Sequence, residues 1–139
     1  MKPIWMAALI GAAGIAACAQ AAPYARTEQL VARGEYLVTG IGGCNDCHTP
    51  MTAAGPDMSR TLQGGELIFG PMIDMPWAPY APPLAGGLTA YSDAEFAALL
   101  QTGLRPDGST PRPPMPPFRL SAADAEAVVA YIKTLPPAP

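Results

Sequence analysis

The chain has 139 residues, which is enough for one domain and not comfortably for two. Only 14% of the residues are charged and the formal net charge is −3, so the charge balance argues against nucleic acid as a partner. The 18 prolines and 14 glycines predict a few helices joined by long, stiff loops rather than a continuous helical bundle.

The first segment of the chain is apolar and carries almost no charge. Lys2 precedes an apolar run over residues 4–17, and no further charged residue occurs before Arg26. The run is short for a membrane span and is typical of the apolar core of an export signal. Residues 1–21 are therefore predicted to direct export to the periplasm, and residues 22–139 to form the mature domain.

Two processing schemes fit the end of this segment. Ala19-Gln20-Ala21 is a small-x-small cleavage site that would release a soluble protein beginning near Ala22. Ile15-Ala16-Ala17-Cys18 instead resembles the lipobox of bacterial lipoproteins, in which Cys18 would become the lipidated first residue. The second scheme is slightly favoured because it explains a lone cysteine in an exported chain. Lipidation at Cys18 would be the only attachment to a membrane.

A helix is predicted after Thr27, which can serve as its N-cap, and it should run to about Thr39. Four of its positions recur at helical spacing and form one apolar stripe: Leu30, Gly34, Leu37 and Ile41. A glycine inside a helix costs about 1 kcal/mol relative to alanine. Gly34 therefore predicts a second helix packed closely against the first, with Tyr131 or Val128 as the expected partner.

Residues 44–48, with the sequence Cys-Asn-Asp-Cys-His, carry the clearest chemical signal in the chain. Two thiols two residues apart, followed directly by a histidine, are typical of a c-type haem attachment site. In one helical turn Cys44 and Cys47 can each form a thioether with one vinyl group of a single porphyrin. His48 then reaches the iron as an axial ligand, and a backbone carbonyl near Thr49-Pro50 is expected to accept a hydrogen bond from its other ring nitrogen. One motif predicts one haem.

A zinc site and a redox-active pair are the alternatives for two such cysteines. Zinc usually takes four ligands, and outside residues 44–48 the chain offers no other histidine and only Cys18. A thioredoxin-like pair would lie in a βαβ pattern, which is not visible in this sequence. Both alternatives are therefore disfavoured.

The segment after the motif is irregular. Prolines and glycines leave little room for long elements over residues 51–83, and residues 61–69 are predicted to hold one short strand or hairpin arm. Trp77 and Tyr80 are candidates to donate hydrogen bonds to a haem propionate. The alternative is that both simply pack beneath a loop.

Two further helices are predicted from their caps. Ser92 and Glu95 form a capping box that opens a helix running to about Thr102. A proline-rich loop over residues 104–118 follows, and Ser121 caps the last helix. The sequence thus predicts an all-α fold with three to four helices and long loops around one covalent haem.

The second axial ligand of the iron must be something other than histidine, because His48 is the only histidine in the chain. Met115 is best placed, since it lies between two helices and is flanked by prolines that fix its backbone. Met72 and Met75 remain alternatives, as does an open coordination position. Two other methionines follow the motif too closely to reach around the ring: Met51 and Met58.

Several segments together carry a family resemblance: Arg33-Gly34-Glu35-Tyr36-Leu37, residues 44–50, residues 91–96, Met115-Pro116 and residues 131–136. With these segments the chain resembles the class I (mitochondrial-type) monohaem cytochromes c. The closest likeness is to the cytochrome c domains of electron-transfer subunits of bacterial periplasmic dehydrogenases. The resemblance implies an all-α cytochrome c domain over residues 22–139, His48/Met115 ligation and electron transfer. Residues 71–87 depart from it because they are unusually rich in proline.

The function that follows is a periplasmic one-electron carrier, soluble or lipid-anchored, rather than an enzyme. It would pass electrons from a dehydrogenase or membrane complex to an acceptor cytochrome or oxidase, and Arg105, Arg112 and Lys133 are candidates to surround the haem edge. A haem enzyme or a gas-binding sensor with an open distal site is the alternative. A non-catalytic subunit, tethered by Cys18 or held by a partner enzyme, would share the chemistry of the carrier.

Overall fold

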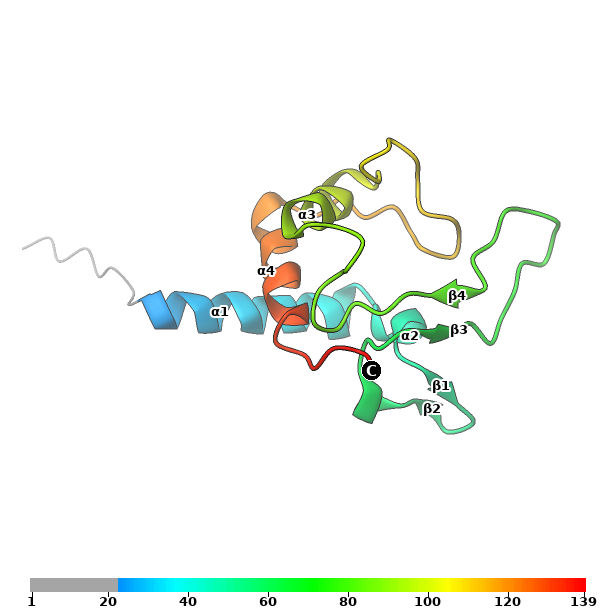
Figure 1. Ribbon diagram of the computed structural model, residues 1–139, viewed down its shortest axis with the longest axis horizontal. Helices are drawn as coiled ribbons and strands as arrows, with labels where there is room; N and C mark the ends of the chain where they lie inside the picture. Colours follow the sequence, from blue (N-terminus) through cyan, green and yellow to red (C-terminus); the bar gives the residue numbers. More distant parts are fainter. Residues whose placement is uncertain (1–22) are drawn as a thin grey trace, which may run out of the picture.

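The computed structural model describes residues 23–139, so the expected export segment and Cys18 lie outside the described residues. The helical elements are α1 (Pro23–Tyr36), the π-helical turn η1 (Leu37–Ile41), α2 (Asn45–His48), the 3₁₀ turn η2 (Met58–Arg60), α3 (Asp93–Thr102) and α4 (Ala122–Ile132). The strands are β1 (Met51–Thr52), β2 (Gly55–Pro56), β3 (Gly65–Glu66) and β4 (Tyr80–Ala81). The expectation of a mainly helical domain with three to four helices and long loops is confirmed (Figure 1).

Helix α1 differs from the expected helix at both ends. It begins at Pro23, before the expected cap at Thr27, because proline is well tolerated in the first turn of a helix. Its C-terminal end widens into the π-helical turn, in which the Gly42 N–H donates to the Leu37 carbonyl at 2.7 Å. The prediction that Ile41 continues the apolar stripe is wrong, since its side chain is 67% exposed. The wider turn shifts the helical phase beyond Leu37 and moves Ile41 off the buried face, while Val38, four residues after Gly34, is buried.

Helices α1 and α4 cross in close contact at Gly34, as the sequence predicts (Figure 1). A Cβ atom at Gly34 would overlap the Ala127 carbonyl oxygen and lie 2.7 Å from the Tyr131 Cβ atom. Tyr131 is thus confirmed as a partner of Gly34, while Ala127 takes the place proposed for Val128. At the edge of the crossing the exposed Arg33 Nε donates to Asp124 Oδ1 at 2.8 Å.

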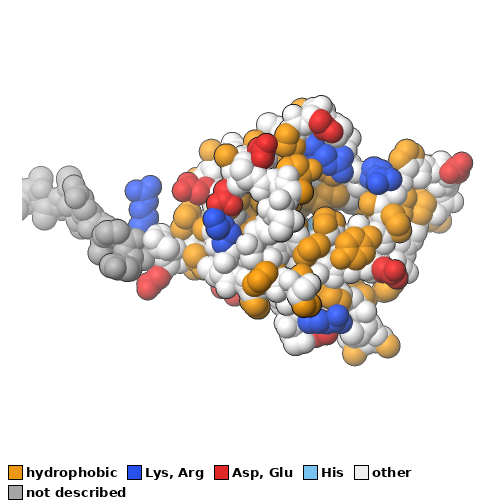
Figure 2. Space-filling view, viewed as in Figure 1, with side chains coloured by type: hydrophobic (Ala, Val, Ile, Leu, Met, Phe, Trp, Pro, Cys, Tyr) orange, Lys and Arg blue, Asp and Glu red, His pale blue; other side chains and the backbone are white. Residues whose placement is uncertain are grey.

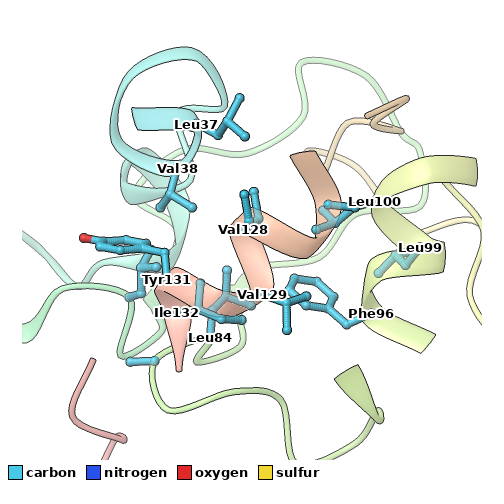
Figure 3. Close-up of a cluster of buried hydrophobic side chains, with 14 residues drawn as sticks. Leu37, Val38, Leu84, Phe96, Leu99, Leu100, Val128, Val129, Tyr131 and Ile132 are labelled. Atoms are coloured by element: carbon cyan, nitrogen blue, oxygen red, sulfur yellow. The ribbon is translucent and has the colours of Figure 1, made fainter. Parts of the chain in front are cut away.

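Helix α3 packs against α4 and completes the apolar core (Figure 3). The predicted capping box is present: Ser92 Oγ accepts from the Glu95 N–H, and the Glu95 carboxylate accepts from the Ser92 N–H at 2.8 Å. The cap fixes the start of α3, and the buried apolar side chains of this helix belong to the same core as those of α4. The larger buried side chains are Leu37, Val38, Leu62, Leu84, Phe96, Leu99, Leu100, Val128, Val129, Tyr131 and Ile132.

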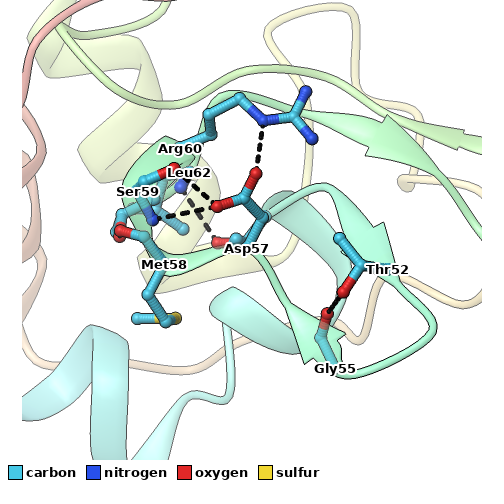
Figure 4. Close-up of polar contacts among 9 residues, drawn as sticks. Thr52, Gly55, Asp57, Met58, Ser59, Arg60 and Leu62 are labelled. Carbon is cyan, nitrogen blue, oxygen red and sulfur yellow. Dashed lines mark hydrogen bonds and ion pairs between the residues drawn. The ribbon is translucent and has the colours of Figure 1, made fainter.

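The strands form two small antiparallel sheets in the loops between α2 and α3. β1 pairs with β2 and β3 pairs with β4, and β3 is the short strand predicted within residues 61–69. The loop over residues 57–60 is closed by its own side chains, because the Asp57 carboxylate accepts from Ser59 and from Arg60 Nε at 2.7 Å (Figure 4). Residues of the segment with β3 and β4 form one wall of a cavity, whose other walls come from the helices and from the proline-rich loop between α3 and α4.

Candidate haem-binding site

A cavity of about 270 Å³ lies between the helical core and the loops. Cys44, Cys47 and His48 line it from the turn of α2, and Met115 lines it from the proline-rich loop before α4. Most of the remaining lining is apolar, including Phe96. The structure therefore brings all four predicted site residues to one apolar cavity.

The attachment turn is held by the backbone that precedes it. Gly43 has a φ of +58°, a left-handed conformation that favours glycine, and it lets the chain reverse after η1. The Cys44 N–H then donates to the Val38 carbonyl at 3.1 Å, and the His48 N–H donates to the Cys44 carbonyl at 2.8 Å. As a result Cys44 and Cys47 lie one helical turn apart, and both are free thiols that line the cavity.

His48 is buried and its orientation is fixed by a distant loop. Its Nδ1 atom lies 2.7 Å from the Pro82 carbonyl oxygen. Because a carbonyl can only accept, Nδ1 must carry the proton, which leaves Nε2 with a free lone pair. Burial lowers the pKa of His48, although the hydrogen bond to Pro82 partly opposes this shift. The ring is therefore held as the neutral imidazole, which is the form that binds a metal ion.

The prediction that the acceptor would lie near Thr49-Pro50 is wrong. The chain leaves α2 at Thr49 in an extended conformation, so the backbone that directly follows His48 runs away from the ring. Pro82 reaches the ring because the Leu84 N–H donates to the Leu62 carbonyl at 2.8 Å, which brings the later loop back over α2. A contact between residues so far apart in sequence leaves no local signal.

A buried hydrogen-bonded group beside His48 was also missed by the sequence reasoning. Thr49 Oγ1 donates to Asn45 Oδ1 at 3.0 Å and accepts from the Leu62 N–H at 3.0 Å. Thr49 is 2% exposed and Leu62 is fully buried, so these bonds form away from water. Thr49 thereby joins the loop that carries Leu62 to α2. The only sequence feature that could have indicated the role of Thr49 is its position directly after the histidine.

The pKa values of the two thiols argue against a reactive redox pair. Burial raises the pKa of Cys44 to about 11 and also raises the pKa of Cys47. Reactive redox cysteines instead have lowered pKa values, because the thiolate is the reactive form. The zinc alternative lacks ligands. Within residues 23–139, no three side chains of histidine, cysteine, aspartate or glutamate gather in a metal-binding group.

Of the methionines within residues 23–139, Met115 alone lines the cavity. Its loop is closed by a turn in which the Met115 N–H donates to the Arg112 carbonyl at 3.3 Å. Met72 is fully exposed, Met75 is 37% exposed, and neither contributes to the lining. The geometry thus favours Met115 over Met72 and Met75 as the candidate thioether ligand.

The polar residues expected at the haem edge divide into two groups. Tyr80, Arg105 and Arg112 line the cavity. The expectation for Lys133 is wrong, because this residue lies outside the lining and its Nζ pairs with Asp93 Oδ2. The propionate role of Trp77 stays a prediction: its side chain is not part of the lining, but its Nε1 atom is buried and has no hydrogen-bond partner among residues 23–139.

The residues present fit a covalently bound haem. Two free thiols on one helical turn, a neutral imidazole with Nε2 available, a thioether and apolar walls form the donor set that a c-type haem requires. The fold and the site together define a small helical domain that binds haem c.

The comparison with protein families gives the particular family. The model for Cytochrome c matches residues 31–136, so the chain belongs to the cytochrome c family and carries a covalently attached haem c. The expected small all-α cytochrome c fold is likewise confirmed.

Relatives of the chain are found among bacterial cytochromes and dehydrogenase subunits. The chain is 34% identical over 84% of its length to the alcohol dehydrogenase (quinone) cytochrome c subunit of Gluconacetobacter polyoxogenes. It is 32% identical over 75% of its length to a diheme cytochrome c-type protein of Cereibacter sphaeroides, and 31% identical over 74% to one of the nicotinate dehydrogenase subunits of Pseudomonas putida. The matches span 27%, 35% and 9% of these relatives, so the chain corresponds to about a third of their length or less.

Proposed function

We propose that this chain is a one-electron carrier in which Cys44 and Cys47 hold one haem and His48 and Met115 are its axial ligands. The observation that carries the proposal is that all four side chains line the same apolar cavity. If His48 and Met115 both bound the iron, no coordination position would be left for a substrate, and the haem would supply one-electron chemistry alone.

The surrounding residues suit this role. The Pro82 carbonyl orients the His48 ring and keeps Nδ1 protonated, so that Nε2 would be available to bind the iron. The prolines on either side of Met115 restrict the backbone and hold the sulfur in place, which matters because an iron–thioether bond is weak. Methionine ligation also raises the reduction potential relative to a second histidine.

The described lining of the cavity offers no carboxylate and no free imidazole as a base. Among residues 23–139 it includes no aspartate, no glutamate and no histidine other than His48, and His48 is the proposed metal ligand. A peroxidase would need a distal base. The haem-enzyme and gas-sensor alternatives would require Met115 to leave the metal, so the carrier function fits the lining better. By itself the domain is therefore proposed to be non-enzymatic.

The partners and the location are proposed from the relatives and from the sequence. Cytochrome subunits of alcohol and fructose dehydrogenases are among the relatives, which supports a dehydrogenase as electron donor and another cytochrome or an oxidase as acceptor. The apolar residues 4–17 support export to the periplasm. No helix within residues 23–139 is long and apolar enough to cross a membrane.

The ligand assignment is tested by the absorption spectra of the haem-loaded protein, with and without carbon monoxide. We expect a weak long-wavelength ferric band from iron–sulfur charge transfer and a ferrous spectrum that carbon monoxide does not change. Met115→Ala should abolish the band and open the iron to carbon monoxide, whereas the matched variant Met72→Ala should do neither. Ready binding of carbon monoxide to the wild type would instead favour the sensor or enzyme alternative.

The membrane attachment is tested separately by mass spectrometry of the mature amino terminus. A diacylated Cys18 would establish the lipid anchor. A chain that begins at Ala22 would rule the anchor out and leave a soluble carrier.

A further inference from the structure

The loop between β3 and β4, residues 67–79, is an apolar segment that the haem-binding role does not explain. Ten large apolar side chains are exposed in the described chain, and six of them lie within residues 68–80. These six are Ile68, Phe69, Met72, Ile73, Met75 and Tyr80. We call residues 67–79 the apolar arm. The arm extends beyond β3 and β4, away from the crossing of α1 and α4 (Figure 1), and apolar side chains gather on this side of the molecule (Figure 2).

The apolar arm is anchored at its base. The Leu67 N–H donates to the Pro79 carbonyl at 2.9 Å, next to the paired strands β3 and β4. The rings of Phe69 and Trp77 lie edge to face, with centroids 6.0 Å apart. The arm also contains three prolines, which restrict its backbone. A contact surface that is already restricted in this way loses less conformational entropy on binding.

The charges around the apolar arm are complementary to each other. Asp74 is the only ionisable residue of the arm, and it is exposed. The Ala78 N–H donates to the Pro113 carbonyl at 2.8 Å, which joins the arm to the proline-rich loop that carries Arg112. Arg112 is exposed and forms no ion pair with any residue in the described part of the chain. In a two-fold symmetric pair, the carboxylate on the arm of one copy can face the guanidinium on the adjoining loop of the other copy.

We propose that the apolar arm is a contact surface for a second copy of this chain. In an isologous pair the exposed methionine and isoleucine side chains of the two arms pack together, and Asp74 of each copy faces Arg112 of the other. Leu67, Ala78 and Tyr80 belong to the arm or border it and also line the haem cavity, so the contact would place two haem sites near one interface. A relative that matches this chain over 35% of its own length is named a diheme cytochrome, in keeping with paired haem domains.

A membrane surface is a less suitable occupant. Asp74 lies in the middle of the arm, and residues 67–79 contain no lysine or arginine that could contact anionic headgroups. A bilayer that received the arm would therefore have to accommodate a carboxylate with no basic residue on the arm itself. One loop per copy forms a small interface, so we expect a weak, reversible dimer with a dissociation constant of about 10 μM to 1 mM.

The test is sedimentation velocity of the haem-loaded protein at concentrations from about 10 μM to 1 mM. We expect a concentration-dependent dimer that persists at high salt, because most of the contact is apolar. Met72→Gln/Ile73→Thr should raise the dissociation constant at least tenfold. The matched control Met58→Gln/Ile41→Thr makes the same chemical changes at exposed positions outside the arm, and it should leave the dimer unchanged. Asp74→Lys should weaken the dimer, and most strongly at low salt.

Three results would overturn the proposal: a wild type that stays monomeric over the whole concentration range, a dimer that survives Met72→Gln/Ile73→Thr, or a dimer that the control pair weakens equally. Binding of the monomer to vesicles of phosphatidylethanolamine and phosphatidylglycerol, lost in the arm variant, would identify a membrane contact instead. The dimer does not depend on the electron-carrier function. Normal spectra in a monomeric protein would refute the dimer alone, and a dimer that binds carbon monoxide would refute only the carrier.

Discussion

The crossing of α1 and α4 and the loop that follows α2 are both closely packed, but by different interactions. At the crossing, Gly34 lets two helix backbones meet, and apolar side chains on both sides fill the remaining space. In the loop, a few hydrogen bonds hold the chain around His48: two are formed by Thr49 Oγ1, and in a third the Pro82 carbonyl accepts from His48 Nδ1. The crossing therefore distributes its stabilising free energy over many contacts, whereas the loop depends on single polar atoms.

This difference separates the stability of the fold from the geometry of the haem ligands. Changes at the crossing should destabilise the whole domain while leaving His48 normal in the molecules that remain folded. Changes in the loop should affect both stability and the haem spectrum, because the same residues pack the loop and orient the ring. The following variants test this distinction, from the largest expected effect to the smallest.

Gly34→Ala should be the most destabilising single change. The new Cβ atom would overlap the Ala127 carbonyl oxygen, which is part of a helix backbone and cannot rotate away. We expect a loss of about 3 kcal/mol or more in the free energy of unfolding, measured by urea denaturation of the haem-loaded protein. Gly40→Ala is the control, since its Cβ would meet only the Tyr36 ring at 3.6 Å. Equal stability of the two variants would show that the helices can separate at little cost.

Thr49→Val tests the loop. The substitution keeps the shape of the side chain but leaves Asn45 Oδ1 and the Leu62 N–H without partners in a buried environment. An unpaired buried polar group costs about 1–3 kcal/mol, so we expect a loss of about 2 kcal/mol or more.

Unlike Gly34→Ala, Thr49→Val should also change the haem spectrum or the reduction potential. The loop that it releases carries Leu62, whose carbonyl accepts from the Leu84 N–H and so holds the later loop with Pro82. Thr52→Val removes an exposed hydroxyl that donates to the Gly55 carbonyl, and it should change neither property (Figure 4). A Thr49→Val protein with lower stability and an unaltered potential would mean that Thr49 packs the loop without positioning His48.

Gly42→Ala should perturb haem attachment more than global stability. Its Cβ would lie 2.8 Å from the Leu37 carbonyl oxygen and 3.3 Å from Cys44 Sγ, so Cys44 would have to shift. We expect a destabilisation of about 1–2 kcal/mol. Mass spectrometry should detect more chains whose haem is held by Cys47 alone. Gly70→Ala is the control because a Cβ there has open space, and comparable attachment in both variants would contradict the role of Gly42.

The features that could be predicted from the sequence depend on contacts between residues within one or two helical turns of each other. The spacing of Cys44, Cys47 and His48 specifies a turn that places both thiols on one side, and the structure forms it. Ser92 and Glu95 likewise specify a helix start by contacts three residues apart. These interactions join residues no more than four positions apart, so the local sequence suffices to predict them.

The features that could not be predicted depend on tertiary contacts. The π-helical turn moves Ile41 to the surface, although the residue fits the helical spacing, because a periodicity argument assumes a constant 3.6 residues per turn. Pro82 accepts from His48 only because Leu62 and Leu84 join two loops. The residues that hold the candidate ligands in place are therefore harder to recognise than the ligands themselves.

Ser92→Ala should have the smallest effect and adds a dependence on pH. The Ser92 hydroxyl and N–H both donate to the Glu95 carboxylate, and these bonds lower the pKa of Glu95 below its ordinary value of 4.5. A lowered carboxylate pKa stabilises the folded state at pH values above the ordinary pKa, and this stabilisation is lost as the pH falls through the folded-state pKa.

Loss of the Ser92 cap should cost about 1 kcal/mol at neutral pH. Because part of that cost is the bond to the carboxylate, the difference from the wild type should shrink below about pH 4.5. Urea denaturation between neutral pH and pH 3 measures this trend, with Ser59→Ala as a loop control whose hydroxyl donates to Asp57. A difference that stays constant across this range would show that the hydroxyl stabilises α3 through the Glu95 N–H alone.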